Sequence, residues 1–451
     1  MGRPGCSEVC PSTTHSDIGR SGLREATRNN GLVMITDSSD DCCHGLEPHP
    51  LESEIQQHRP QGDLVLQGFE RLVNKCFEES DTSLSPGSAG ENLSIDPVNF
   101  KNALLTRLGS SILPLLQQQL ITLSGLFKSS DFLNQPGPKL NLILEIQPSL
   151  EDNLDQIQSI IYTLYPEILE EVPSQTNDQH EERAKIFRLH GLGECLDEKL
   201  FDYMPDLFRV FSQLIRQLGL STQRCDHPRN IRHRLNLYSS WSQNAIETTI
   251  KWVNGSELDL VQLRWEDQFK DILRTLEHFI DSTHITIHQE IRSRRAAGKS
   301  VRDYRSDSIL QVAESLIPVI KLSMLFFNKT SNQAMNRKRL PLFTKISSSQ
   351  LAVVADSALF SNMDLGDFHR ILLNIPFARD FSRDDLTSRA QRYKTRMESA
   401  MFLIILYFLP GDLPAHHPDK SWYVDWYTAF NQTIFNFIKT VESVSNNGLQ
   451  L

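Results

Sequence analysis

Apolar side chains recur every three or four residues along the chain from Gly62 to about Glu442. This spacing places them on one face of an α-helix, whereas a half-buried β-strand would need alternation at every second residue. The pattern therefore predicts amphipathic helices and no sheet. The expected helices span about 62–77, 96–127, 140–165, 196–218, 228–253, 257–296, 304–329, 348–375, 383–409 and 419–442.

Residues typical of helix ends accompany several of these segments. Asp96 is a good N-cap and Pro97 suits the first helical position. Ser256 with Asp259, and Ser382 with Asp385, have the spacing of a capping box. Pro114 lies inside an expected helix, and we expect it to kink or divide that helix because proline removes an internal hydrogen bond.

Helices of about 20 to 40 residues joined by short loops predict an all-α fold, with long antiparallel helices in one or two bundles. We expect a disordered N-terminal tail over residues 1–61, where Gly, Pro, Ser, Asp and His show no apolar period. A helical bundle over 62–220 and a second over 226–445 are predicted, with the division near 219–226. The polar segment 172–182 is expected to be a linker.

The sequence contains no segment typical of export or membrane insertion. The first 20 residues lack the apolar region of about 7 to 15 residues found in secretory signals. The longest apolar run covers residues 401–409, whereas a membrane-spanning helix needs about 20 residues, so we expect a buried core helix. The seven cysteines, five of which lie within the first 76 residues, do not have the number and spacing of a disulfide framework. These features predict a cytoplasmic or nuclear protein without membrane association.

The charge is unevenly distributed. The net charge of −10 argues against a protein whose whole surface binds nucleic acid. Residues 141–182 contain ten acidic residues and no Lys or Arg, whereas residues 291–355 contain twelve Lys and Arg against three acids. The two stretches could face one another, recruit charged partners, or be solvated helix faces, which is the usual meaning of such runs. Arg337, Lys338 and Arg339 form the candidate partner-binding basic patch.

Four motifs resemble chemical sites but lack an essential residue. Residues 296–300 (AAGKS) end like a phosphate-binding loop, but Ser293 stands where the first glycine is required. His284 and His288 have metalloprotease spacing, but Ile285 replaces the glutamate. The Cys42, Cys43, His44 and His49 group has no second ligand pair, and Asp384-Asp385 does not continue into a magnesium-binding motif. We therefore predict no catalytic residue, cofactor or metal.

Three segments carry a resemblance: residues 110–127 (SSILPLLQQQLITLSGLF), 142–167 (LILEIQPSLEDNLDQIQSIIYTLYPE) and 316–331 (LIPVIKLSMLFFNKTS). Together they resemble an uncharacterised, lineage-expanded family of helical proteins from rust fungi and, more distantly, cyclin-D-binding-protein-like helical bundles. The resemblance covers most of the chain from about residue 62. It implies a helical fold and carries over no catalytic residue.

These observations favour a non-enzymatic helical interaction or adaptor protein that binds a protein partner through bundle grooves. One alternative is an enzyme whose site is assembled from scattered helix residues. Another is binding of nucleic acid or an acidic partner through the basic 291–355 region. A deep polar pocket with shifted acids would favour the enzyme, and an exposed groove would favour the adaptor.

Overall fold

The structure of the chain is a computed structural model, which describes residues 55–77, 97–128, 132–168, 177–223, 230–297, 304–331, 341–374, 383–409 and 418–448. All of them belong to one compact unit, residues 50–451. Most of the predicted disordered tail, residues 1–54, lies outside the described residues. The prediction is wrong for residues 59–61, which it assigned to the tail. They belong to the first long helix, which begins at Arg59 rather than Gly62.

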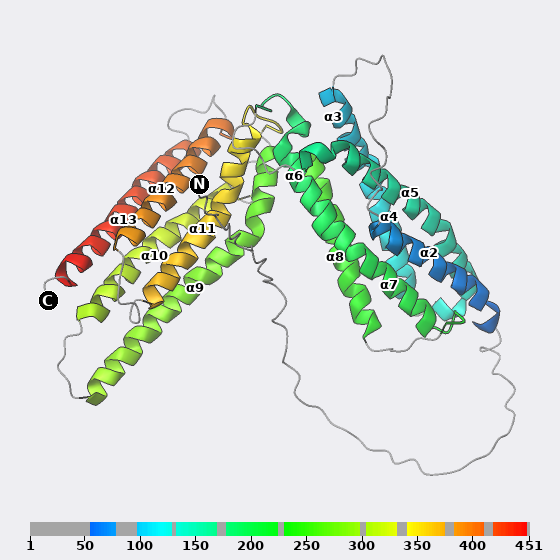
Figure 1. The fold of residues 1–451 in the computed structure, drawn as a ribbon, viewed down its shortest axis with the longest axis horizontal. Coiled ribbons are helices and arrows are strands. Elements are labelled where there is room, and N and C mark those ends of the chain that lie inside the picture. The colour runs from blue at the N-terminus through cyan, green and yellow to red at the C-terminus, as the bar shows by residue number, and fades with distance from the viewer. Residues whose placement is uncertain are drawn as a thin grey trace, which may run out of the picture. The chain divides into compact units, whose positions relative to one another are not determined.

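The predicted all-α fold is confirmed, since the described residues contain helices and no strand. The α-helices are α2 (Arg59–Phe77), α3 (Pro97–Arg107), α4 (Leu113–Lys128), α5 (Pro136–Ile168), α6 (Ile186–Cys195), α7 (Phe201–Gln217), α8 (Ile231–Asn254), α9 (Glu257–Ala297), α10 (Tyr304–Thr330), α11 (Ser348–Asn374), α12 (Arg383–Tyr407) and α13 (Pro418–Gly448) (Figure 1).

Local signals explain several helix ends. Asp259 accepts a hydrogen bond from the Ser256 hydroxyl at 2.7 Å and its own N–H donates to that hydroxyl at 3.2 Å, so the predicted capping box is confirmed. The helix around Pro114 is divided as expected: a π-helical turn, Leu108–Ile112, separates α3 from α4. Ser382 lies outside the described residues, so its predicted cap stays a prediction.

One helix was absent from the predicted series. Residues 186–195 form α6, which continues through a π-helical turn, Leu196–Leu200, into α7. Gly191 and Gly193 lie inside α6, and glycine disfavours an isolated helix by about 1 kcal/mol per residue. Tertiary packing therefore stabilises a helix that the local sequence does not favour.

The helices that precede residue 255 surround one core. In the order α2, α5, α4, α8 and α7, each packs beside the next, and α7 packs back on α2. Phe69 of α2 stacks with Phe208 of α7 and lies against Phe211, with ring centroids 6.3 and 5.4 Å apart. The α2 and α5 helices are parallel, because Gln147 binds Val65 near their starts and Lys75 pairs with Asp155 further along.

Five further helices surround a second set of core residues in the order α9, α10, α13, α12 and α11 (Figure 1). The α12 and α13 helices are antiparallel, since Arg383 pairs with Glu442 while the Phe402 ring lies 5.8 Å from the Tyr427 ring. In contrast, α9 and α11 run parallel. The prediction of antiparallel neighbours thus holds for α12 and α13, whereas the α2–α5 and α9–α11 pairs are parallel.

The predicted division near 219–226 stays a prediction. The α8 helix follows that division but packs against α4, α6 and α7, and much less against α9. These contacts favour a boundary at Gly255, where α8 ends and α9 begins.

The apolar run of residues 401–409 is only partly in the core. Met401, Ile404, Phe408 and Leu409 are buried, but Phe402 and Leu406 are exposed, so the prediction of a buried core helix is wrong for one face of α12. Consecutive apolar residues over more than two turns lie on every side of a helix. The side chains that point away from the core therefore remain exposed. Among the described residues, no helix has the length and hydropathy required to cross a bilayer.

Candidate functional site

Lys185 lies just before α6 and is 1% exposed, as is its ion-pair partner Glu257 at the start of α9. Its ammonium also donates to the carbonyl oxygens of Thr344 and Ile346, each at 2.8 Å. An ammonium group has three N–H bonds, so all of its donors are used. A buried charge is tolerated when it is paired and fully hydrogen-bonded, and Lys185 meets both conditions.

Glu257 also binds the loop between α10 and α11, to which Thr344 and Ile346 belong. Its Oε2 atom accepts hydrogen bonds from the Thr344 N–H at 2.9 Å and from the Thr344 hydroxyl at 2.6 Å. Its own N–H donates to the Leu342 carbonyl at 3.2 Å. The loop between α10 and α11 is therefore fixed to the start of α9 and to the residue preceding α6.

Asp178 makes a second polar connection beside this ion pair. It accepts hydrogen bonds from the N–H of Ser348 at 2.8 Å, from the Ser348 hydroxyl, and from the N–H of Ile186 at 3.1 Å. The Ser348 hydroxyl in turn accepts a bond from the N–H of Phe187 at 2.8 Å. The starts of α6 and α11 are thus joined through one buried carboxylate and one hydroxyl.

Arg188 caps the C-terminal end of α8. Its guanidinium donates to the carbonyl oxygens of Trp252 at 2.7 Å, Val253 at 3.3 Å and Gly255 at 2.9 Å. The last carbonyls of a helix have no partner within it, and they carry the negative end of the helix dipole. Burial is the largest influence on this group and lowers the Arg188 pKa to about 10, so the side chain stays charged at neutral pH.

Gly191 permits a close approach between α6 and α8. A Cβ atom at this position would lie 2.2 to 2.5 Å from three ring carbons of Trp252, whose ring is buried. Replacing Gly191 by alanine should therefore lower the free energy of unfolding by about 1–3 kcal/mol, because the rigid indole must move. Urea denaturation measures this loss. Gly125 meets no atom within 4 Å and is the control, at which alanine should not destabilise; equal effects would contradict the packing argument.

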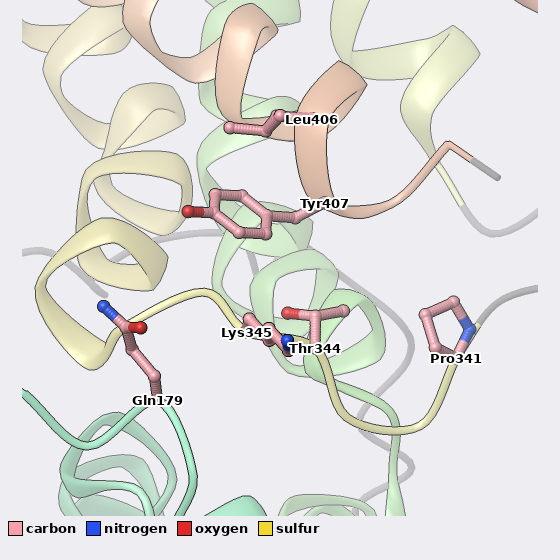
Figure 2. Close-up of a pocket in the computed structure, with 6 residues that line it drawn as sticks. All are labelled: Gln179, Pro341, Thr344, Lys345, Leu406 and Tyr407. Carbon is pink, nitrogen blue, oxygen red and sulfur yellow. The ribbon is translucent and has the colours of Figure 1, made fainter. Parts of the chain in front are cut away.

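A pocket of about 550 Å³ adjoins this polar network and is lined by Gln179, Pro341, Thr344, Lys345, Leu406 and Tyr407. Figure 2 shows Leu406 and Tyr407 on α12 facing the loop that carries Thr344 and Lys345. Thr344 belongs to both features, since it also binds Glu257. One wall of the pocket is therefore held in place by the buried ion pair.

The apolar face of α12 leads away from this pocket. Leu406 is 69% exposed, and Phe402, one turn earlier, is 54% exposed. Residues four apart lie on the same side of a helix. We call Phe402, Leu406 and the pocket residues the α12 surface. The sequence signal for it was the run of nine apolar residues, too long for a helix with one polar face.

The carboxyl groups with the clearest upward pKa shifts lie elsewhere. Burial raises the pKa of Asp197, Asp356 and Asp364, and none of these three lines either described pocket. Burial also raises the pKa of Cys76 to about 12 and that of Cys195 to about 11, so both thiols are protonated at neutral pH. Among the described residues, no group of three His, Cys, Asp or Glu side chains could hold a metal ion.

Most of the predicted site residues fall outside the ranges that the structure describes. Arg337, Lys338 and Arg339, the AAGKS glycine, lysine and serine, and the Cys42 group lie outside the described residues, as do the side chains of His284 and His288. The patch prediction therefore stays a prediction. Sequence inspection missed Asp178, Lys185, Arg188 and Glu257, each of which gains its partners from distant segments.

A described contact between the two charged stretches is made by hydrogen bonds. Asp178 of the acidic stretch binds Ser348, which lies within the basic stretch, through hydrogen bonds. Elsewhere in the acidic stretch, Glu151 and Asp155 pair with Arg71 and Lys75 of α2. Part of the acidic charge is thus compensated within the first group of helices.

Comparison with known families divides the chain at Gly255. Residues 101–254 match the model of a domain of unknown function (DUF8723), and residues 256–439 match that of a second domain of unknown function (DUF8721). No curated protein matches the chain. Lys185 lies in the first matched region and Glu257 in the second, so the buried ion pair connects the two.

Proposed function

We propose that this chain, in which a buried ion pair connects two domains of unknown function, is a non-enzymatic helical interaction protein whose partner binds the α12 surface. The observation that supports this proposal is the exposure of Phe402 and Leu406, one turn apart, beside a pocket. An exposed apolar strip of this kind can pack against an amphipathic helix whose apolar residues recur every three or four positions. The affiliation with helical proteins of rust fungi, and the cytoplasmic or nuclear location, remain expectations.

The chemistry of the surface suggests the chemistry of the partner. Two large apolar side chains favour an apolar helix face, and the exposed Lys345 at the pocket favours a partner with an acidic residue beside that face. Arg337, Lys338 and Arg339 precede the pocket loop in sequence and would strengthen the same preference. We therefore propose an amphipathic partner helix with an acidic flank.

Replacing both Phe402 and Leu406 by serine should weaken partner binding by at least about a hundredfold, because burying each side chain contributes about 1.5–3 kcal/mol. The full chain serves as bait in its native cell extract, and the affinity of a recovered partner is then measured by calorimetry. The control is Leu64→Ser on α2, where the exposed leucine lies outside this surface.

A partner that the control retains and the double variant loses would support the α12 surface. Retention by both variants would contradict this surface and leave the adaptor function resting on another. Loss on replacing Arg337, Lys338 and Arg339 by alanine would show that the basic patch contributes. Binding of nucleic acid, the alternative through that patch, predicts an affinity that falls steeply with salt.

A further inference from the structure

Two histidines face each other across the parallel helices α9 and α11. The Nδ1 atom of His278 on α9 lies 3.2 Å from the Nε2 atom of His369 on α11. The two rings are nearly perpendicular, with centroids 4.9 Å apart. The His278 side chain is exposed and that of His369 is partly exposed, so the pair is open to solvent. No local pattern indicates this pair, since its members are 91 residues apart in the chain.

The two helices hold these rings in position. One turn before His278, the Thr275 hydroxyl donates to the side-chain oxygen of Asn362 on α11 at 3.4 Å. On the other side, the Phe279 ring packs edge-on against the His369 ring, with centroids 5.6 Å apart. Side chains that project from packed helices form a more precise site than side chains on loops. The distance between the two nitrogens is therefore fixed by the packing of α9 against α11.

That distance suits two ligands of one metal ion. Imidazole nitrogens bind Zn²⁺ at about 2.0–2.1 Å, so two of them on a tetrahedral ion lie about 3.3–3.4 Å apart. The 3.2 Å between the His278 and His369 nitrogens is close to this separation. Among the described residues, no third His, Cys, Asp or Glu completes a set with them. Water molecules would therefore fill the remaining positions, as in metal sites that keep an open side.

The protonation state and the local charge also favour a cation here. Burial, and then the neighbouring His278, lowers the pKa of His369, so this imidazole is largely neutral at neutral pH. The neutral ring is the form that binds a metal. Asp281 is an exposed carboxylate three residues after His278, on the same side of α9. The nearby cations Arg274 and Arg370 each pair with an aspartate on their own helix.

We propose that His278 and His369 bind one divalent transition-metal ion of the class that prefers imidazole nitrogen, and that this ion links α9 to α11. Zn²⁺ and Cu²⁺ belong to this class, whereas Mg²⁺ prefers oxygen ligands. An ion that binds only the folded arrangement of the two helices stabilises it. The pair shares no residue with the α12 surface or with a smaller pocket between α9 and α10, so this site does not depend on the partner surface.

Zn²⁺ and Mg²⁺ test the proposal on the full, unaltered chain. Zn²⁺ should slow amide hydrogen exchange in the helical turns around both His278 and His369, whereas Mg²⁺ should not. Mass spectrometry locates this protection in the chain, so an ion bound elsewhere, such as at the Cys42 group, does not imitate it. No protection at either histidine with Zn²⁺ at millimolar concentration would overturn the proposal and leave the pair as a hydrogen bond between two rings.

Glutamine variants separate this pair from the other histidines of α9. His278→Gln and His369→Gln each keep a polar side chain but remove one of the two protein ligands. Each should weaken Zn²⁺ binding, measured by the same protection, at least tenfold, since losing even an outer partner of a ligand costs about 10- to 100-fold. The control His284→Gln/His288→Gln replaces two histidines four residues apart on α9 and should retain the full protection.

The pattern across the variants decides the assignment. Protection that survives in both single variants, or that is lost in the control, would contradict binding by His278 and His369. Protection that only the control retains would support it. The comparison of Zn²⁺ with Mg²⁺ on the unaltered chain stays decisive if a variant does not fold.

Discussion

Replacing Lys185 by methionine is expected to lower the free energy of unfolding by about 3–5 kcal/mol. The substitution leaves the Glu257 carboxylate buried without its cation, and the Thr344 and Ile346 carbonyls without their shared donor. Urea denaturation followed by circular dichroism measures the loss. Hydrogen exchange should also accelerate at the amides of Thr344 and Ser348, because the loop between α10 and α11 is no longer held from the α6 side.

Two controls separate the buried charge from a general effect of losing a lysine. Lys75→Met removes a pair that is partly exposed to solvent, with Asp155, and should cost at most about 1 kcal/mol. The double variant Lys185→Met/Glu257→Leu removes both charges and should recover part of the loss, although the Thr344 N–H then lacks its acceptor. A Lys185→Met chain as stable as Lys75→Met would contradict the proposed role of the ion pair.

Replacing Arg188 by methionine should lower the free energy of unfolding by more than about 3 kcal/mol, since hydrogen bonds from a charged donor contribute about 1.5–3 kcal/mol each. Three carbonyls at the end of α8 lose their donor. Arg188→Lys should be intermediate, because an ammonium keeps the charge but cannot reproduce the planar fork. The same denaturation experiment measures both variants.

The matched control for Arg188 is Arg209→Met, which removes a guanidinium that pairs with Asp206 three residues away on an exposed face of α7. This change should cost at most about 1 kcal/mol. Hydrogen exchange near residues 252–255 should increase in Arg188→Met and not in Arg209→Met. Loss of stability without faster exchange there would show that the carbonyl contacts are not the cause.

The sequence predicted the secondary structure closely because long helices with an apolar stripe carry their signal locally. The expected segment 257–296 is α9 (Glu257–Ala297), and 348–375 is α11 (Ser348–Asn374). The capping box at Ser256 was also predictable, since its two side chains are three residues apart. The α6 helix was missed because its two glycines weaken the local signal, while their lack of side chains permits its contact with Trp252.

The candidate sites depended on contacts that no local pattern contains. Lys185 meets Glu257 across 72 residues of chain and Thr344 across 159. A lone lysine in a polar segment is usually a solvated side chain, so nothing in its neighbours marked it as buried. The Gln262 amide likewise donates to the Thr330 carbonyl, 68 residues away, a contact that no local pattern indicates.

The sequence by itself therefore determined the all-α class, most helix bounds and the excess of apolar residues in α12, since each depends on neighbours within a few turns. The tertiary structure decided which charges are buried, which parallel pairs interrupt the antiparallel order, and which face of α12 stays exposed. Those outcomes depend on segments that meet only after folding, where burial turns an ordinary lysine, arginine or glutamine into a group that must find its hydrogen-bond partner.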